Sequence, residues 1–316
     1  MSVLRAHGLQ TPSTPWIVVV NWNGASLLPA CLAALGALDT RPRVLVVDNG
    51  STDSSREVAA GFEGVEWVSL EGNQGFAQAC NVGLRRALDS GARWIGTVNT
   101  DVCVEPEWLC RLVEAGETHP HVGILGGLLV FEDEPGRVNS TGLVLDPLWR
   151  ARDRDFGAPL HALKTCDGPV VAVSGAAALF RAEALRRAGL FDPEYSAYCE
   201  DLDLCLRAAR LGIGAWFVSG ARASHGYGRS FGADSPLQRY LLARNHLRIL
   251  ATHAPWPLAA MAVPLLALLR AALRAPLEIL RGRPDLAVAH WRAARDGLGA
   301  ALAGARRRLA PGREGP

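Results

Sequence analysis

The chain has 316 residues, of which 49% are hydrophobic, and its formal net charge is only +2. This length predicts one large or two small domains with a substantial core. The seven cysteines are an odd number without a C-x-x-C pair. Their pattern argues against a zinc ribbon or a disulfide framework and favours reduced thiols in a cytosolic protein.

The two ends of the sequence differ in charge. From residue 270 onward, ten arginines and four acids give the tail a charge of +6, so the remainder carries about −4. The first 15 residues lack the apolar segment of a signal peptide. The longest apolar run, residues 254–269, has 16 residues and three prolines, which is short of the ~20 residues that a transmembrane helix needs. We therefore expect this run to touch a membrane surface at most.

Strands and helices alternate over the first hundred residues. The predicted strands are residues 16–22, 43–48, 65–70 and 94–99, and the predicted helices begin at Ser26, after Ser51 and at residue 76. This alternation predicts an α/β fold with a mostly parallel central sheet that is flanked by helices. Sites in such sheets lie at the carboxyl ends of the strands. We therefore expect Asn21, Asp48 and the tip Asn99-Thr100-Asp101 to share one rim.

The pattern changes after residue 120. Residues 122–131, 137–145 and 169–180 are predicted to be antiparallel strands. A compact helix is predicted at residues 200–212, where Gly212 ends it, and a short strand follows at 215–218. From about Pro236 the sequence is rich in Ala, Leu and Arg and predicts a helical extension.

The first two strand tips have two interpretations. Asp48 could accept hydrogen bonds from a base or a ribose, with Asn21 beside it in a nucleotide pocket. Alternatively, the segment is a turn in which Ser51 or Thr52 caps the next helix, and these segments alone do not decide between the two. The sequence contains neither G-x-G-x-x-G at these tips nor G-x-x-x-x-G-K-[ST], so a Rossmann dehydrogenase or a P-loop enzyme loses support.

A Gly-rich loop precedes the third helix. It supplies Asn73 and Gly75, and Asn81 follows in the helix. Backbone N–H groups at such a helix start can bind an anion. The alternative is a plain loop and a helix in which Asn81 is merely tolerated.

The tip Asn99-Thr100-Asp101 offers one carboxylate and one amide oxygen. Magnesium and manganese bind oxygen donors and often complete their coordination with substrate phosphates and water, so one protein carboxylate can suffice. The alternative is an acid that helps to start a helix near Pro106, and on this segment alone the helix start is the better interpretation.

Acidic residues are densest at residues 191–208. They are Asp192, Glu194, Glu200, Asp201 and Asp203. Acids in the first turn of a helix are stabilised by its dipole, so capping accounts for some of them. A carboxylate in this group could also serve as a general base for a hydroxyl nucleophile.

A lone histidine, His225, lies farther on, between small residues and before Gly228, Arg229 and Ser230. His225 either has a structural role or belongs to a flexible loop that could bind a phosphate.

Taken in order, seven stretches resemble the inverting family 2 glycosyltransferases, especially their bacterial rhamnosyltransferase-like members. They are VVVNWNG, VVDNGSTD, GNQGFAQACNVGL, VNTDVCVEPEWL, the segment from SGAAALF to RAARLG, ASHGYGRS and RYLLARNHLRIL. The resemblance covers roughly residues 16 to 250. It implies a GT-A fold with a small antiparallel part, a nucleotide-sugar donor (dTDP-rhamnose or a UDP-sugar) and a divalent cation, Mg²⁺ or Mn²⁺.

The resemblance also implies roles for individual residues. Asp101 and His225 would be metal ligands, Asp201 the catalytic base, and Glu200 a residue that orients the acceptor. Asp48 would bind the base and ribose. The other expected donor-binding residues are Asn21, Trp22, Asn23, Asn49, Asn73, Gly75, Phe76, Asn81, Asn99, Thr100 and Arg244.

Two departures from the family pattern stand out. Asn99 replaces the first Asp of the family's D-x-D element, as is common in this subgroup. Ser196-Ala197 stands where related members carry bulky residues, which puts the identity of the acceptor in doubt.

The expected reaction is attack of an acceptor hydroxyl on the anomeric carbon, opposite the leaving nucleoside diphosphate, with inversion. The expected acceptor is a glycan or a lipid-linked glycan of a cell-surface polysaccharide, and no nucleic acid is expected as a partner.

The domain expectation has three parts. Residues 1–15 form a flexible N-terminus, residues 16–235 the catalytic domain (nucleotide-binding half 16–102, acceptor half 103–235), and residues 236–316 a helical, Arg-rich extension. The extension either lies at a membrane surface, or packs on the catalytic domain or forms a homodimer. An extension that lies at a membrane surface would place a cytoplasmic protein at the inner face of the plasma membrane.

Two rival functions remain. A nucleotidyltransferase of similar sheet order should carry a Gly-rich signature with Lys or Arg near the N-terminus, which VVVNWNG lacks. A non-catalytic binding protein of the same fold is the other rival, and the presence of Asp48, Asp101, Asp201 and His225 argues against it.

Overall fold

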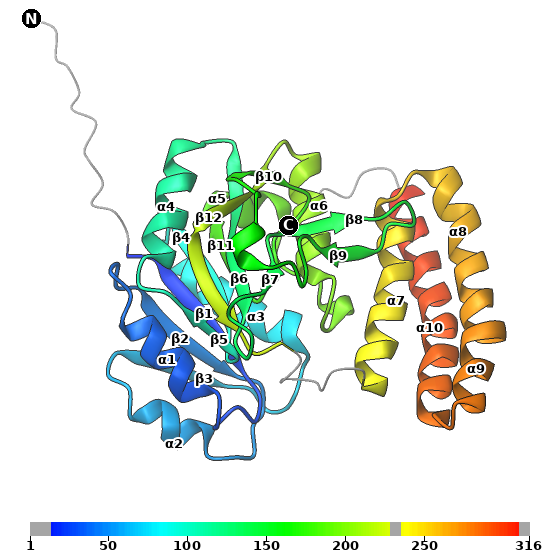
Figure 1. Cartoon of the computed structure of the whole chain (residues 1–316), viewed down its shortest axis with the longest axis horizontal. Coiled ribbons are helices and arrows are strands. Elements are labelled where there is room, and N and C mark those ends of the chain that lie inside the picture. The colour runs from blue at the N-terminus through cyan, green and yellow to red at the C-terminus, as the bar shows by residue number, and fades with distance from the viewer. Residues whose placement is uncertain (1–13, 228–234, 310–316) are drawn as a thin grey trace, which may run out of the picture.

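The structure is a computed structural model that describes residues 14–227 and 235–309. An α/β part is followed by a bundle of long helices at its side (Figure 1). The strands are β1 Trp16–Asn21, β2 Arg43–Asp48, β3 Val65–Ser69, β4 Trp94–Asn99, β5 Val102–Val104, β6 Val122–Phe131, β7 Val138–Ser140, β8 Leu143–Leu145, β9 Ala151–Asp153, β10 Gly168–Val170, β11 Ala177–Arg181 and β12 Gly214–His225. The α-helices of the α/β part are α1 Leu28–Gly36, α2 Ser55–Ala60, α3 Phe76–Asp89, α4 Trp108–Thr118, α5 Ala182–Ala188 and α6 Glu200–Arg210, and the 3₁₀ turns are η1 Leu160–Ala162 and η2 Pro193–Tyr195.

One large sheet organises the α/β part. Its strand order is β10-β12-β6-β11-β4-β1-β2-β3, with β5 paired to β12 and β7 paired to β6. Strands β4, β1, β2 and β3 are mutually parallel, and β6 is parallel to β12. Strand β11 runs antiparallel between β4 and β6, and β8 and β9 form a separate antiparallel hairpin. The predicted mostly parallel sheet with a small antiparallel part is confirmed.

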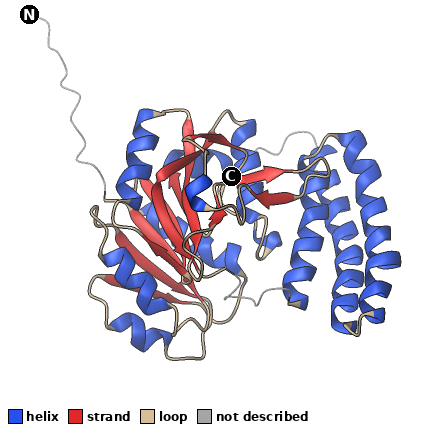
Figure 2. Cartoon of the chain, viewed as in Figure 1, coloured by secondary structure: helices blue, strands red, loops and turns tan. Residues whose placement is uncertain are grey.

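Helices cover both faces of the sheet (Figure 2). Alternate residues of a strand point to opposite faces, so Ile17 and Val19 pack with α1 and α4, whereas Val18 packs with α3 and α6. This division explains why the strands read as continuous apolar runs in the sequence, because both of their faces are buried.

The second half differs from the sequence prediction in detail. Residues 137–145 form two strands rather than one, because Gly142 has a φ of +110° and turns the chain between β7 and β8. Residues 169–180 likewise divide into β10 and β11. The short strand expected at 215–218 lies near the start of the much longer β12.

The C-terminal bundle consists of α7 Pro236–His253, α8 Trp256–Leu269, a π-helical turn η3 Arg270–Arg274, α9 Ala275–Leu280 and α10 Pro284–Leu309. Helices α7, α8 and α10 share an apolar core rich in alanine and leucine, and the tip of the β8–β9 hairpin reaches it through Trp149 (Figure 1). The hairpin is fixed there by a hydrogen bond between His246 Nε2 and the carbonyl of Leu148, at 2.7 Å.

The apolar run did not end at Leu269 as expected. Helices α8 and α9 continue through η3, so the described part of the chain contains one helix, Trp256–Leu280, that is long and apolar enough to cross a membrane. It has 25 residues, and its most apolar window has a mean hydropathy of 1.7 and is 22% buried in the protein. The expectation that the run is too short to span a bilayer was therefore wrong on length, because Arg270 and Arg274 do not terminate the helix.

Candidate active site

The polar strand tips meet at one edge of the sheet. Asn21 at the end of β1 lies opposite Asp48 at the end of β2, and Asn99 at the end of β4 pairs with Val20 on the other side of β1. The antiparallel strand β11 begins at the same edge, where the Asn99 N–H donates to the carbonyl of Ala176 at 2.8 Å. The expected common rim is present.

Asp48 is held in a fixed orientation on this rim. Its Oδ1 accepts from Asn21 Nδ2 at 3.0 Å and from the Ser51 hydroxyl, and its Oδ2 accepts from the Ser51 N–H at 3.2 Å. Ser51 therefore does not cap α2, which begins at Ser55, where the Ser55 N–H donates to Asp53 Oδ1 at 3.1 Å. The turn-and-cap interpretation is wrong for Ser51, a residue that the sequence did not single out for the site.

The neighbouring donor-side residues form a hydrogen-bonded surface. Asn23 Oδ1 accepts from the Thr52 N–H at 2.8 Å, and Trp22 beside it is 43% exposed. Asn49 Nδ2 donates to Asn73 Oδ1 at 3.1 Å, so the second strand tip is joined to the loop that precedes α3.

Gly75 in that loop has a φ of +85°, and an added Cβ would lie 2.6 Å from Ser196 Oγ. Only glycine fits this close approach. Phe76, the next residue, packs on the core beside α3, and Thr100 is buried in the turn after β4.

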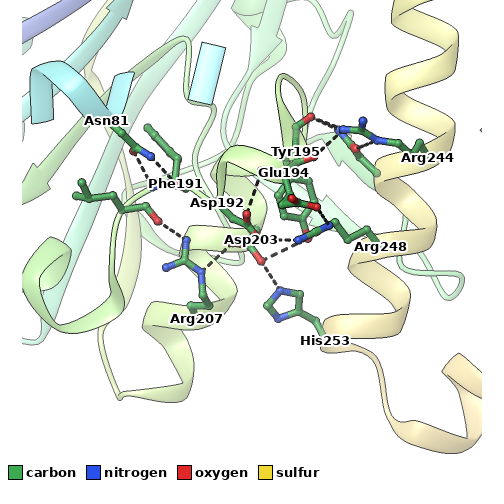
Figure 3. A network of polar contacts seen from close by, with 12 residues as sticks. Asn81, Phe191, Asp192, Glu194, Tyr195, Asp203, Arg207, Arg244, Arg248 and His253 are labelled. Atoms are coloured by element: carbon green, nitrogen blue, oxygen red, sulfur yellow. Dashed lines mark hydrogen bonds and ion pairs between the residues drawn. The ribbon is translucent and has the colours of Figure 1, made fainter. Parts of the chain in front are cut away.

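Two of the expected donor-binding residues contact the scaffold. Asn81 is buried, and its amide donates to the Phe191 carbonyl at 2.8 Å and accepts from the Phe191 N–H at 3.1 Å. Arg244 donates from Nη2 to the carbonyls of Glu194 and Tyr195, both at 2.8 Å. These hydrogen bonds hold both side chains against the backbone (Figure 3), and whether either one binds the donor stays a prediction.

Asp101 and His225 come together although they are 124 positions apart in the sequence. Strand β5 pairs with the end of β12, and the Gly226 N–H donates to the Asp101 carbonyl at 2.8 Å. His225 Nε2 lies 3.6 Å from Asp101 Oδ1. Helix α4 begins only at Trp108, after β5, so Asp101 does not start it and the helix-start interpretation is wrong.

His225 has a polar neighbour at its other ring nitrogen. His225 Nδ1 lies 2.9 Å from Asn139 Oδ1, and a proton on Nδ1 would be donated to this oxygen and would leave a lone pair on Nε2 toward Asp101. Burial lowers the pKa of His225, against the opposing charge of Asp101, which favours the neutral ring. A neutral imidazole oriented by a hydrogen bond at its other nitrogen is the usual state of a histidine that binds a metal.

The residues around Asp101 fit a divalent cation that also binds substrate. Within residues 14–227 and 235–309, no three His, Cys, Asp or Glu side chains gather into a closed metal site. Asn99 Oδ1 is nevertheless buried without a hydrogen-bond partner in this part of the chain. A carboxylate, an amide oxygen and a neutral imidazole suit Mg²⁺ or Mn²⁺, which takes its remaining ligands from phosphates and water.

The acid cluster divides into two groups. Asp192 and Glu194 form ion pairs with Arg248, and Asp203 pairs with Arg207 and His253 (Figure 3). These three acids have structural partners. Among the described residues, Glu200 and Asp201 at the first turn of α6 have no such ion pair.

Asp201 reaches the rim of the sheet. Its Oδ2 accepts from the Gly175 N–H at 2.9 Å, and its Oδ1 accepts from the Leu202 N–H at 2.7 Å. Burial raises the pKa of Asp201, because a low-dielectric surrounding disfavours its charged form. Burial also raises the pKa of Glu200, and the adjacent charge of Asp201 raises it further. Glu200 Oε2 is buried and has no hydrogen-bond partner among the described residues.

Two further residues connect these groups. Burial raises the pKa of Tyr198 to about 12, and the negative charges of Glu200 and Asp101 add to the increase. Burial likewise raises the pKa of Asp153 on β9 to about 6, and the charge of Asp201 adds to the increase. The sequence did not identify Asp153 as a candidate, because the segment around it contains several charged residues and no recognisable motif.

Comparisons with known proteins identify the family of this chain. A family model for glycosyl transferase family 2 matches residues 16–189, more than half of the chain. An N-acetylglucosaminyl-diphospho-decaprenol L-rhamnosyltransferase from Mycobacterium tuberculosis is 29% identical over 240 residues, covering 69% of this chain and 78% of the relative.

Solved structures with the same fold are more distant in sequence. A mannosyltransferase from Pyrobaculum calidifontis, in complex with GDP-Man and Mn²⁺, has a TM-score of 0.56 and 19% identity and covers 90% of this chain and 86% of its own. GalNAc-T7 with UDP, GalNAc and Mn²⁺ has a TM-score of 0.58 and 17% identity and covers 76% of this chain. The match spans only 48% of the GalNAc-T7 chain. The chain therefore belongs to glycosyl transferase family 2, and it is a glycosyltransferase with the GT-A fold.

Proposed function

We propose that this enzyme transfers a sugar, with inversion, from a nucleoside diphosphate sugar to a hydroxyl of a lipid-linked glycan during synthesis of a cell-surface polysaccharide. The carrying observation is that Asp48 ends β2, that Asp101 follows β4 at the same edge and lies 3.6 Å from His225, and that Asp201 accepts from Gly175 just before β11 begins there. The name of the M. tuberculosis relative supports L-rhamnose as the sugar and a diphospho-lipid as the acceptor. The preferred donor is therefore dTDP-rhamnose, and a UDP-sugar is the second choice.

The donor would lie along the first two strand tips. Asn21 and Ser51 fix the carboxylate of Asp48, whose remaining lone pairs can accept from a base N–H or a ribose hydroxyl. The exposed ring of Trp22 and the amides of Asn49 and Asn73 provide the adjoining surface. In this proposal residues 16–235 form the catalytic domain, with the donor in the half that ends at residue 102.

Asp101 and His225 would hold Mg²⁺ or Mn²⁺, with Asn99 as a neutral neighbour. A bound ion neutralises the negative charge that develops on the leaving diphosphate. Asn139 would keep the His225 ring in the orientation that leaves Nε2 available.

Asp201 would be the general base. Its raised pKa makes it a stronger base than an exposed aspartate. It accepts the proton of the acceptor hydroxyl while that oxygen attacks the anomeric carbon from the face opposite the diphosphate. Glu200 would orient the acceptor, and holding the two reactants in line supplies the rest of the rate enhancement.

The outer face of the long helix would lie against a lipid surface. Met261, Leu265 and Leu268 on α8 are 74%, 55% and 63% exposed, and Leu273 and Leu280 beyond the π turn are 56% and 83% exposed. A single π turn inserts about one residue, which rotates the following residues back by roughly 100° and keeps this stripe on one side of the helix. Arginines at the helix end favour an anionic headgroup layer.

We prefer an interfacial helix to a spanning one. Arg270, in the middle of the helix, donates to the carbonyl of Ala243 at 2.8 Å and contacts the His246 ring, which fastens the helix to α7. The enzyme would thus work at the cytoplasmic face of the membrane, where a lipid-linked acceptor is presented.

Vesicle binding tests the membrane contact. The protein should co-sediment with vesicles that contain phosphatidylglycerol and less with pure phosphatidylcholine, and Leu265→Glu with Leu268→Glu should abolish the binding. If the same double variant instead converts a dimer into a monomer and no vesicle binding is seen, the face is a homodimer interface and the membrane proposal fails.

The transfer itself is tested in two steps. A panel of nucleotide sugars with Mn²⁺ should give the largest rise in melting temperature for the true donor, because a ligand that binds only the folded state stabilises it. Proton NMR of the product formed from that donor and a synthetic GlcNAc-diphospho-lipid should show the anomeric configuration opposite to the donor's. Retention of configuration, or a panel in which no nucleotide sugar raises the melting temperature, would contradict the proposal.

A further inference from the structure

The segment just before Glu200 has an unfavourable backbone conformation. Ser196, Tyr198 and Cys199 have φ angles of 64°, 66° and 68°. Only three other non-glycine residues in the described part of the chain have a positive φ. L-residues avoid this region because the Cβ approaches the backbone, so the surrounding contacts must impose the conformation.

Helix α7 supplies those contacts from one side. Asn245 is fully buried, and its Nδ2 points at three carbonyl oxygens of the segment, those of Tyr195 at 3.0 Å, Ala197 at 2.8 Å and Tyr198 at 2.7 Å. Its Oδ1 accepts from Arg244 Nε at 2.9 Å, and this bond fixes which way the amide faces. The amide therefore binds carbonyls that lie before and within the strained segment.

A second contact of α7 lies one turn farther along (Figure 3). Arg248 is ion-paired with Asp192 at 2.8 Å and Glu194 at 3.1 Å, and its guanidinium lies 5.1 Å from the centre of the Tyr195 ring. His253 at the end of α7 donates to Asp203 at 2.8 Å, which ties the helix to α6. These contacts hold the approach to α6, whereas Asn245 binds the carbonyls of the strained turn itself.

The donor half of the protein holds the segment from the opposite side. The Ala77 N–H at the start of α3 donates to the Ser196 carbonyl at 2.9 Å, and Gly75 leaves room for Ser196 Oγ. The segment is thus fixed between the donor loop and α7. Directly after it come Glu200 and Asp201, and Asp201 is aimed at Gly175 on the rim.

We propose that Asn245 is a positioning residue for the transfer reaction: it imposes the left-handed turn at Tyr198-Cys199 that sets Asp201 at the rim of the donor site. This inference rests on the proposed function, with Asp201 as the base. It also gives the helical extension a part in catalysis, although α7 lies outside residues 16–189 that match the family model.

Asn245→Asp tests the inference with almost no change in volume, because it places a carboxylate oxygen against three carbonyl oxygens in place of the amide donor. Asn245→Ala is the second variant, in case the aspartate prevents folding. The matched control is Tyr240→Phe, which removes a different α7 hydrogen bond, that of the Tyr240 hydroxyl with Asp296 at 3.0 Å.

Turnover of dTDP-rhamnose with a synthetic GlcNAc-diphospho-lipid should fall by ~100-fold in both Asn245 variants, since a misplaced group about 1 Å from its productive position costs about that much. Affinity for dTDP with Mn²⁺ should stay within twofold of the wild type. Tyr240→Phe should leave both quantities unchanged. Unaltered turnover in a folded Asn245 variant, or turnover and dTDP affinity that fall together, would overturn the inference.

Hydrogen–deuterium exchange provides a readout that does not need activity. Backbone amides of residues 196–202 should exchange at least tenfold faster in either Asn245 variant, while those of β1 and β2 stay as in the wild type. If wild-type protein turns over no donor but this local exchange appears, the proposed function fails and the role of Asn245 in fixing the turn stands. Uniform exchange across wild type and variants would refute the role of Asn245.

Discussion

Replacing Glu200 by glutamine should make the protein more stable at alkaline pH while making it a poorer enzyme. The side chain is 5% exposed, and its Oε2 has no hydrogen-bond partner among the described residues. Burial, followed by the charge of Asp201, raises the pKa of Glu200 above its ordinary value. The folded protein therefore holds this proton more tightly than the unfolded chain does.

The sign of the pH dependence follows from that difference. Stability falls as the pH rises from the unfolded pKa, about 4.3, through the raised folded pKa, and the full cost is present above it. An unsatisfied buried polar group costs ~1–3 kcal/mol, and a charged one more. The neutral amide of glutamine avoids the charge-dependent part of this cost, so Glu200→Gln should gain at least ~1 kcal/mol relative to wild type between pH 5 and pH 9.

Guanidinium denaturation of both proteins at pH 5, 7 and 9 measures this gain. The difference between variant and wild type at pH 5 gives the cost of the unpaired amide itself, so only its change with pH reports the charge. Glu57→Gln, at an exposed position on α2, is the matched control and should give a difference that does not change with pH. A Glu200→Gln difference that is equally flat, or that moves against the variant at pH 9, would refute the reasoning.

Three further predictions concern the donor site. Asp101→Ala should remove the dependence of dTDP binding on Mn²⁺ in calorimetry, and equal affinity with and without Mn²⁺ in wild type would argue against the metal site. Asn139→Leu frees the His225 tautomer and should weaken Mn²⁺ binding by ~10–100-fold, measured by electron paramagnetic resonance of the free ion; unchanged binding would contradict it. Gly75→Ala should cost ~1–3 kcal/mol more than Gly64→Ala in denaturant, because both residues have positive φ but only Gly75 lacks space for a Cβ; equal costs would exclude the clash.

The first half of the fold could be predicted from sequence because each strand is a run of apolar residues with a polar end. The rim then follows from parallel pairing alone, as Asn21 and Asp48 illustrate. The strands of the Gly-rich second half could not be delimited correctly from sequence. Gly142, with its positive φ, interrupts residues 137–145, which the sequence predicts as one strand. Nor did composition reveal that the helix after Trp256 passes through two arginines without ending.

Contacts between distant segments were beyond the reach of the sequence. Nothing in the sequence links Asn139 to His225, which are 86 positions apart, or Asn245 to the Tyr198 carbonyl 47 positions before it. The acid cluster illustrates the same limit. Which of its five members are neutralised depends on Arg207, Arg248 and His253, so only the structure separates Glu200 and Asp201 from the rest.

The most direct test of the account is the turnover of Asp201→Asn. If Asp201 is the general base, loss of its carboxylate should lower the rate of sugar transfer by ~10²–10⁴-fold. Calorimetric affinity for dTDP with Mn²⁺ should stay close to that of wild type, since Asp201 contacts Gly175 and Leu202 rather than the donor-side residues. Turnover equal to wild type in the folded Asp201→Asn protein would contradict the assignment of the base and, with it, the proposed mechanism.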